Sequence, residues 1–170
     1  MPLFDQVRQD ASAREDVERS GISRLPEIAP ARQVLHDYQS TTLSLKAHPV
    51  SFVRTELERR GCIQAGELRD EKRSPQGRRV RVAGLVLVRQ RPSTASGIVF
   101  VTLEDESGIA NLIIRPKVFE RYRQAARLSV VLLAEGRVER QGDVVHVQVS
   151  RMDCLDELIE TLPSASRDFH

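Results

Sequence analysis

The segment Arg79-Val-Arg-Val-Ala-Gly-Leu-Val-Leu-Val-Arg-Gln-Arg91 constrains the fold more than any other part of the chain. Apolar and basic residues alternate along it, as in a strand with one face on a core. Gly84 lies in the middle, where it allows a bulge or a sharp bend. A long bent strand predicts a small β-barrel, because one strand must serve both halves of the sheet. The valines expected in the core are Val80, Val82, Val86 and Val88, and the arginines expected on the opposite face are Arg79, Arg81, Arg89 and Arg91.

The segments that follow complete a five-stranded arrangement. Four more stretches show the two-residue period of strands, and Pro116 is well placed to start a helix between the third and fourth strands. The order β-β-β-α-β-β is that of the OB-fold, a five-stranded, partly open Greek-key barrel. We therefore predict a mainly β protein with helices, built on an OB-fold barrel that a small helical segment precedes. The strands are expected over residues 79–91, 98–104, 109–115, 129–139 and 143–152.

A short helical segment is expected before the barrel. Val50, Val53 and Leu57 share one helical face, and Gly61 suits the C-terminal end of the helix. Residues 69–78 have the composition of a surface linker. The predicted organisation is an extended or partly helical arm that is largely disordered in isolation (1–47), a helical segment with linker (48–77), the OB-fold nucleic-acid-binding domain (78–152) and an acidic C-terminal tail (153–170).

Charge is distributed unevenly along the chain. Residues 78–151 carry 13 Lys and Arg against 7 Asp and Glu, although the whole chain has a net charge of only +2. A basic barrel is typical of a protein that binds a polyanion. A solvated basic face with no function is the alternative.

The surfaces on which OB-folds usually bind single strands nominate the candidate contacts. Arginines there suit phosphates, and Phe100 offers a stacking face, although its position slightly favours the core. Aromatic residues make up only 4% of the chain, so weak, salt-sensitive and sequence-tolerant binding is expected. The candidate nucleic-acid-binding residues are Arg89, Arg91, Ser93, Thr94, Phe100, Asn111, Arg115 and Arg140.

Neither catalytic nor metal-binding residues are expected. Glu104-Asp105-Glu106 is an acidic cluster, but it falls at a hairpin tip, where acids are common surface residues. The four histidines show no ligand spacing, and Cys62 and Cys154 fit no disulfide framework or metal site. With no signal peptide and no membrane span in the pattern, the cysteines indicate reduced thiols in a cytoplasmic protein.

The chain resembles the C-terminal OB domain of bacterial family-C DNA polymerases, most closely the error-prone, damage-inducible branch. The resemblance is carried by residues 79–92 and 100–108 within the barrel and by His48-Pro49-Val50 and Arg54 before it. It implies a non-catalytic part of a polymerase that contacts single-stranded template DNA during translesion synthesis and induced mutagenesis. The parent enzyme would use Mg²⁺, but this chain should need no cofactor and should be inactive alone.

The resemblance also implies partners: single-stranded or primer-template DNA, the rest of the polymerase, accessory proteins of the mutagenesis complex and the sliding clamp. The tail itself contains no evident clamp-binding peptide. Two other readings remain. One is an anticodon-binding-like OB domain of another nucleic-acid enzyme. The other is a protein-interaction module of the mutagenesis complex that binds no nucleic acid.

Overall fold

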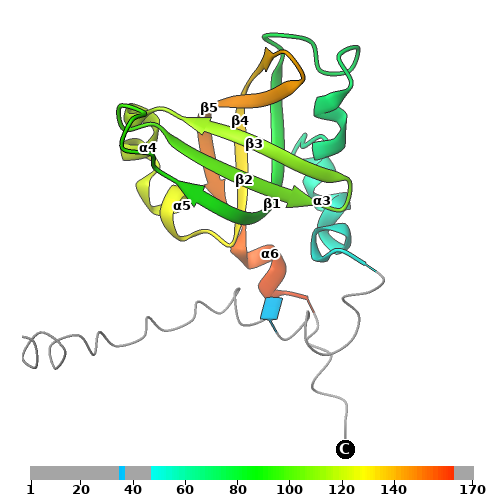
Figure 1. Ribbon diagram of the computed structural model, residues 1–170. Helices are drawn as coiled ribbons and strands as arrows, with labels where there is room; N and C mark the ends of the chain where they lie inside the picture. The colour runs from blue at the N-terminus through cyan, green and yellow to red at the C-terminus, as the bar shows by residue number, and fades with distance from the viewer. Residues whose placement is uncertain (1–34, 37–46, 163–170) are drawn as a thin grey trace, which may run out of the picture.

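The computed structural model describes residues 35–36 and 47–162, and within them five strands close into a barrel (Figure 1). The strands follow one another around the barrel in the order β1-β2-β3-β5-β4. Every neighbouring pair is antiparallel except β3 and β5, which run parallel. The predicted mainly β OB-fold is confirmed. The strands are β1 (Arg79–Gln90), β2 (Val99–Asp105), β3 (Gly108–Ile114), β4 (Val131–Gln141) and β5 (Val144–Cys154).

Strand β1 bends as its sequence predicts. Its first half pairs with β4 and its second half with β2, and the change of partner falls at Leu85. Gly84 allows this change, because a Cβ there would lie only 2.5 Å from the carbonyl oxygen of Glu104 on β2. One strand therefore serves both halves of the barrel.

A bulge between Val86 and Val88 reverses the predicted faces at the end of β1. After the bulge, Val88 lies opposite Thr102 and is 43% exposed, whereas Arg89 lies opposite the buried Val101. The predicted alternation is therefore wrong for these two residues, because an extra residue in one strand shifts the side-chain period by one. Arg89 belongs to the inner side of the barrel end.

Two short helices cover that end of the barrel: α4 (Pro116–Arg121) and α5 (Arg123–Leu128). Phe119 and Ala126 pack into the barrel core. The Arg89 guanidinium donates hydrogen bonds to the carbonyl oxygens of Ala126, at 2.8 Å, and Ser129. Arg89 thus satisfies carbonyls at the end of α5 that have no helical partner.

A second hydrophobic core lies outside the barrel, on the outer face of β1 and β4. The segments packed there are η1 (Pro49–Val53), α3 (Arg54–Arg59) and α6 (Asp156–Glu160). Val50, Val53 and Leu57 are buried in this core, as their helical spacing predicts. The next segment, η2 (Ala65–Arg69), contributes to the barrel core instead. Helical segments that precede and follow the five strands in the chain therefore pack together on the outer face of β1 and β4.

Most of the predicted arm, residues 1–34 and 37–46, lies outside the described residues, as does the end of the tail, 163–170. Within the described ranges, no helix is long and apolar enough to cross a membrane.

The two thiols are expected to differ sharply in reactivity. Cys62 is buried in the second core, and burial raises the pKa of its thiol to about 11, whereas Cys154 is exposed. The thiolate is the reactive form of cysteine. A thiol reagent at pH 8 should therefore label Cys154 rapidly and Cys62 only in denaturant. Time-resolved labelling with a chromogenic disulfide reagent measures this. Equal rates for both thiols in the folded protein would contradict it.

Candidate nucleic-acid interface

The outer face of β2 and β3 is an open, mixed surface. On β2, Val99, Val101 and Leu103 point into the barrel, so Phe100 and Thr102 lie on the outer face. The sequence pattern favoured a core position for Phe100, and that expectation is wrong: the side chain is half-buried on the outer face. Asn111 pairs with Thr102 from β3, and the Thr102 hydroxyl donates to the Asn111 amide oxygen at 3.5 Å.

A groove of about 770 Å³ opens over this face. Its floor is formed by Thr102, Ile109 and Asn111. One wall is the β4–β5 hairpin, and the other is η2 with the residues just after it. In Figure 1, the β4–β5 hairpin, in orange at the top, and η2, at the upper right, both lie beyond the β3 edge of the β2–β3 face. The wall residues are Leu68, Arg69, Glu71, Arg140, Gly142, Asp143, Val144 and Val145.

Arg140 holds the two walls together. Its Nη2 atom donates to the carbonyl oxygens of Leu68, at 2.8 Å, and Ser74, at 2.7 Å. Its backbone N–H donates to the side chain of Gln76 at 2.7 Å. The predicted nucleic-acid contact therefore lines the groove, but these bonds make its first role structural. The end of this wall falls in residues 69–78, which have the composition of a plain linker in the sequence.

The remaining candidates lie at the other end of the face, around the β1–β2 loop. Ser93 and Thr94 are exposed in this loop. The Arg91 guanidinium lies 5.6 Å from the centre of the Phe119 ring. Arg115 is exposed immediately before α4. The structure thus gathers these four residues at the loop and α4, apart from Phe100 and Asn111 on the strands, while Arg89 turns inward. Their contacts with nucleic acid stay predictions.

The arginines at the start of β1 are engaged by a buried acid. Glu135 on β4 is only 5% exposed, and its carboxylate accepts from Arg81 at 2.8 Å and pairs with Arg79. Hydrogen bonds from Arg81 and Arg79 hold the pKa of Glu135 below its usual range, against the opposing effect of burial. Part of the basic face predicted on β1 is therefore neutralised within the barrel.

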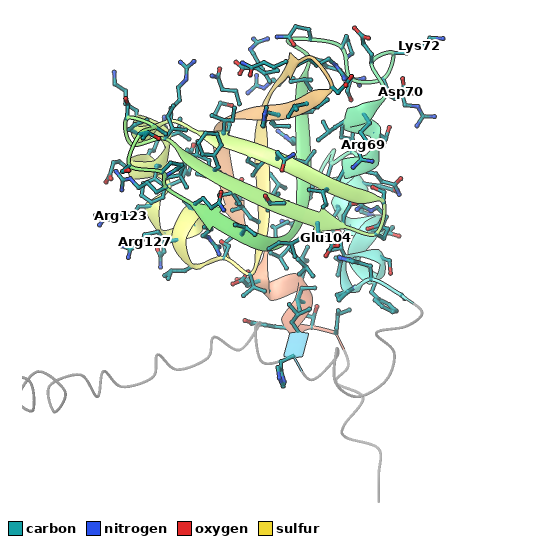
Figure 2. All side chains as sticks on the ribbon, viewed as in Figure 1. Arg69, Asp70, Lys72, Glu104, Arg123 and Arg127 are labelled. Carbon is teal, nitrogen blue, oxygen red and sulfur yellow. The ribbon has the colours of Figure 1, made fainter. Side chains whose placement is uncertain are left out.

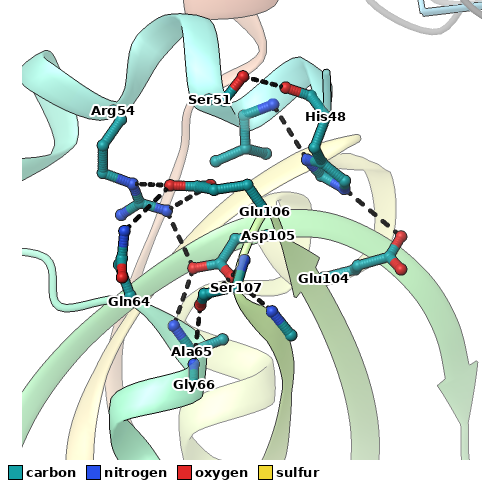
Figure 3. Close-up of polar contacts among 12 residues, drawn as sticks. His48, Ser51, Arg54, Gln64, Ala65, Gly66, Glu104, Asp105, Glu106 and Ser107 are labelled. Carbon is teal, nitrogen blue, oxygen red and sulfur yellow. Dashed lines mark hydrogen bonds and ion pairs between the residues drawn. The ribbon is translucent and has the colours of Figure 1, made fainter. Parts of the chain in front are cut away.

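The acidic hairpin between β2 and β3 is a polar anchor (Figure 3). The Asp105 side chain is 1% exposed, and Arg54 of α3 donates to its Oδ2 at 2.9 Å. Arg54 also binds both carboxylate oxygens of Glu106, at 2.5 and 2.9 Å. The expectation of ordinary surface acids at a hairpin tip is therefore wrong for Asp105, which joins the helical segment to the barrel.

The same ion pairs shift the titration of Glu106. Burial alone would raise the pKa of Glu106, but hydrogen bonding and attraction from Arg54 outweigh it and lower the pKa. The Glu106 carboxylate is therefore ionised at neutral pH. Across residues 35–36 and 47–162, no group of three or more His, Cys, Asp or Glu side chains is arranged to hold a metal ion.

The barrel and its groove define an OB-fold domain. Residues 80–155 match the tRNA anti-codon family, described as an OB-fold nucleic acid binding domain. Asparaginyl-tRNA synthetase from Pyrococcus horikoshii superposes with a TM-score of 0.45 at 22% identity, covering 55% of this chain and 22% of that one.

The sequence relatives are DNA polymerases. The chain is 41% identical over 169 residues to error-prone DNA polymerase 1 of Rhizobium meliloti (strain 1021), which covers 99% of this chain and 14% of that protein. It is 48% identical over 146 residues to the error-prone DNA polymerase of Anaeromyxobacter dehalogenans (strain 2CP-C), 86% of this chain and 12% of that protein. The predicted resemblance to error-prone DNA polymerases is confirmed, and the chain spans a small part of their length.

Proposed function

We propose that this chain is the non-catalytic OB part of an error-prone DNA polymerase and that it binds single-stranded DNA in the groove over β2 and β3. The observation that carries the proposal is the groove itself, because it joins the strand face and the last hairpin, where OB-folds bind single strands. The identity to error-prone DNA polymerases supports DNA as the ligand.

The groove suits a single strand with accessible bases. Asn111 offers an amide on the floor. Phe100 offers a ring on the same outer face of β2, next to the groove rather than among its lining residues. Arg69 is the exposed cation of the wall, since Arg140 is bonded to backbone carbonyls. One ring and few free cations predict modest affinity with little sequence preference.

The wider role rests on the relatives. In the parent polymerase this domain would hold template DNA during translesion synthesis in the cytoplasm, beside Mg²⁺-dependent chemistry carried out by other parts of the enzyme. The rest of the polymerase, the accessory proteins of the mutagenesis complex and the sliding clamp are the proposed protein partners.

Removal of the Phe100 ring should weaken single-strand binding. We expect Phe100→Ala to raise the Kd for a fluorescein-labelled oligo-dT by roughly 5- to 150-fold, because one stacked base contributes about 1–3 kcal/mol. Asn111→Asp, which adds a negative charge to the floor with almost no change of shape, should also weaken binding. Fluorescence anisotropy at several salt concentrations measures both.

Phe52→Ala is the matched control, since it removes an exposed phenylalanine from η1, outside the groove. Equal losses for Phe52→Ala and Phe100→Ala would contradict binding across the outer face of β2 and β3. Preference for a tRNA anticodon stem-loop over oligo-dT would favour the anticodon-binding role. Absence of binding to either, with accessory proteins still captured, would favour the protein-interaction module.

A further inference from the structure

The positive charge of the barrel is concentrated at the end formed by the β1–β2 loop, α4 and α5. The segment 115–128 carries five cations and one acid, Glu120. Arg91 from the β1–β2 loop joins them, because its guanidinium lies over the Phe119 ring of α4. All six cationic residues are exposed. We call this surface the basic end, and its residues are Arg91, Arg115, Lys117, Arg121, Arg123 and Arg127.

Other barrel arginines have partners that reduce their availability to a ligand. Arg79 and Arg81 pair with Glu135, and Arg151 pairs with Asp153. Arg89 and Arg140 donate to backbone carbonyls. At the groove, Arg69 is accompanied by Glu71 and Asp143. The basic end gathers six exposed cations with one acid among them, although Arg78 and Arg137 of the barrel are also exposed.

The cations of the basic end are weakly engaged. Arg121 lies 5.6 Å from the centre of the Tyr122 ring, and Arg123 is 4.0 Å from Glu120. The acids nearest the opposite side of α5 are committed elsewhere. Asp156 accepts from the backbone N–H groups of Val130 and Val131, and Asp153 pairs with Arg151. Ion pairing within the described segments therefore leaves this charge largely uncompensated.

We propose that the basic end binds the phosphate backbone of double-stranded nucleic acid. The Phe119 and Tyr122 rings lie beneath guanidinium groups, so they offer no free platform for an unpaired base. A duplex needs no such platform, and it presents one negative charge per about 1.7 Å of axis, a higher linear density than one strand. A surface of exposed cations without a stacking ring matches that ligand.

The basic end is separate from the groove. Figure 1 places α4 and α5 at the end of the barrel away from α3, and in Figure 2 Arg123 and Arg127 project outward from that end. The groove is lined by η2 and the β4–β5 hairpin instead. The duplex proposal therefore stands or falls independently of single-strand binding in the groove.

The test is a salt titration of the full chain with a labelled 20-base-pair duplex and, in parallel, a labelled single strand. The triple variant R121Q/R123Q/R127Q should weaken duplex binding by roughly 10- to 100-fold at 0.1 M salt. It should also reduce the slope of log K against log salt by about 3, since each lost phosphate contact removes roughly one unit. Binding of the single strand should change much less.

The matched control, R59Q/K72Q/R73Q, removes three exposed cations from the helical segment and its linker and leaves the same net charge. Circular dichroism tests whether each variant is folded. If the triple variant is unfolded, the single variants R123Q and R127Q replace it, and each is expected to lower the slope of log K against log salt by about 1. Three results would overturn the proposal. The control variant could weaken duplex binding as much as R121Q/R123Q/R127Q does, the triple variant could weaken duplex and single-strand binding equally, or it could leave duplex binding unchanged.

Discussion

Replacement of Asp105 with alanine is expected to lower the free energy of unfolding by about 3–5 kcal/mol, because it breaks a buried ion pair and removes the acceptor of several buried donors. A domain of this size is stable by only about 5–15 kcal/mol. The variant should therefore lose a large part of its stability. Urea denaturation of the full chain, followed by circular dichroism, measures the loss.

The geometry explains why this carboxylate matters. Its Oδ2 accepts from Arg54 at 2.9 Å and from the backbone N–H of Ala65 at 2.8 Å. Its Oδ1 accepts from the backbone and hydroxyl of Ser107, at 2.8 and 2.6 Å, and from the Gly108 N–H at 3.1 Å. One side chain thus closes the β2–β3 hairpin and fastens both α3 and η2 to it.

Two neighbouring substitutions make the result specific. Asp105→Asn keeps the shape but loses the charge and one acceptor, so it should destabilise by a smaller but clear amount. Glu104→Gln alters the adjacent acid, whose side chain is 40% exposed and lies 3.5 Å from His48 Nε2, so it should cost less than about 1 kcal/mol. Equal effects of Asp105→Ala and Glu104→Gln would show that the anchor is not the source of stability.

The anchor also connects stability with the proposed site. The Ala65 and Gly66 N–H groups donate to Asp105 and Ser107, so the hairpin fixes the start of η2. Leu68 and Arg69 at the end of η2 then form a wall of the groove. A change at the β2–β3 hairpin should therefore disturb the groove, although none of Glu104, Asp105 and Glu106 lines it.

The fold was predictable because its signals are local. The two-residue period of β1, the start of α4 at Pro116 and the helical face of Val50, Val53 and Leu57 depend only on neighbouring residues. Strand limits differ by about one or two residues from those expected, as is usual at element ends. Gly84 also carried a correct signal, because a glycine within a strand is common at bends.

The details of the site were less predictable because they depend on distant partners. The bulge after Val86 turned Arg89 inward, and no local pattern marks it. Glu135 pairs with Arg79 and Arg81 from a strand more than fifty residues away and offsets one of their two charges. The linker after η2 became a wall of the groove through the bonds of Arg140. Charge counting found the basic barrel, whereas only the structure shows which of its cations are available.

Gly136→Ala is the second substitution with a large expected effect. A Cβ at this position would lie 2.2 Å from the carbonyl oxygen of Gln148 and 2.9 Å from the Val147 side chain. The register of β4 and β5 shifts at Glu135 and Gly136, so the two backbones approach closely there. Because the first obstacle is backbone rather than a mobile side chain, the strands must separate to admit even one methyl group.

The expected cost is about 3 kcal/mol, at the upper end for overpacking, and should appear as a lower urea midpoint. Gly142→Asn is the control, since that glycine sits in the β4–β5 turn with φ +61° and nothing within 4 Å of a Cβ. Asparagine tolerates this conformation, so the control should change stability by less than about 1 kcal/mol. A Gly136→Ala midpoint equal to that of the unsubstituted chain would mean that β4 and β5 can part without cost. The close approach of β4 and β5 at Gly136 would then contribute little to the stability of the barrel.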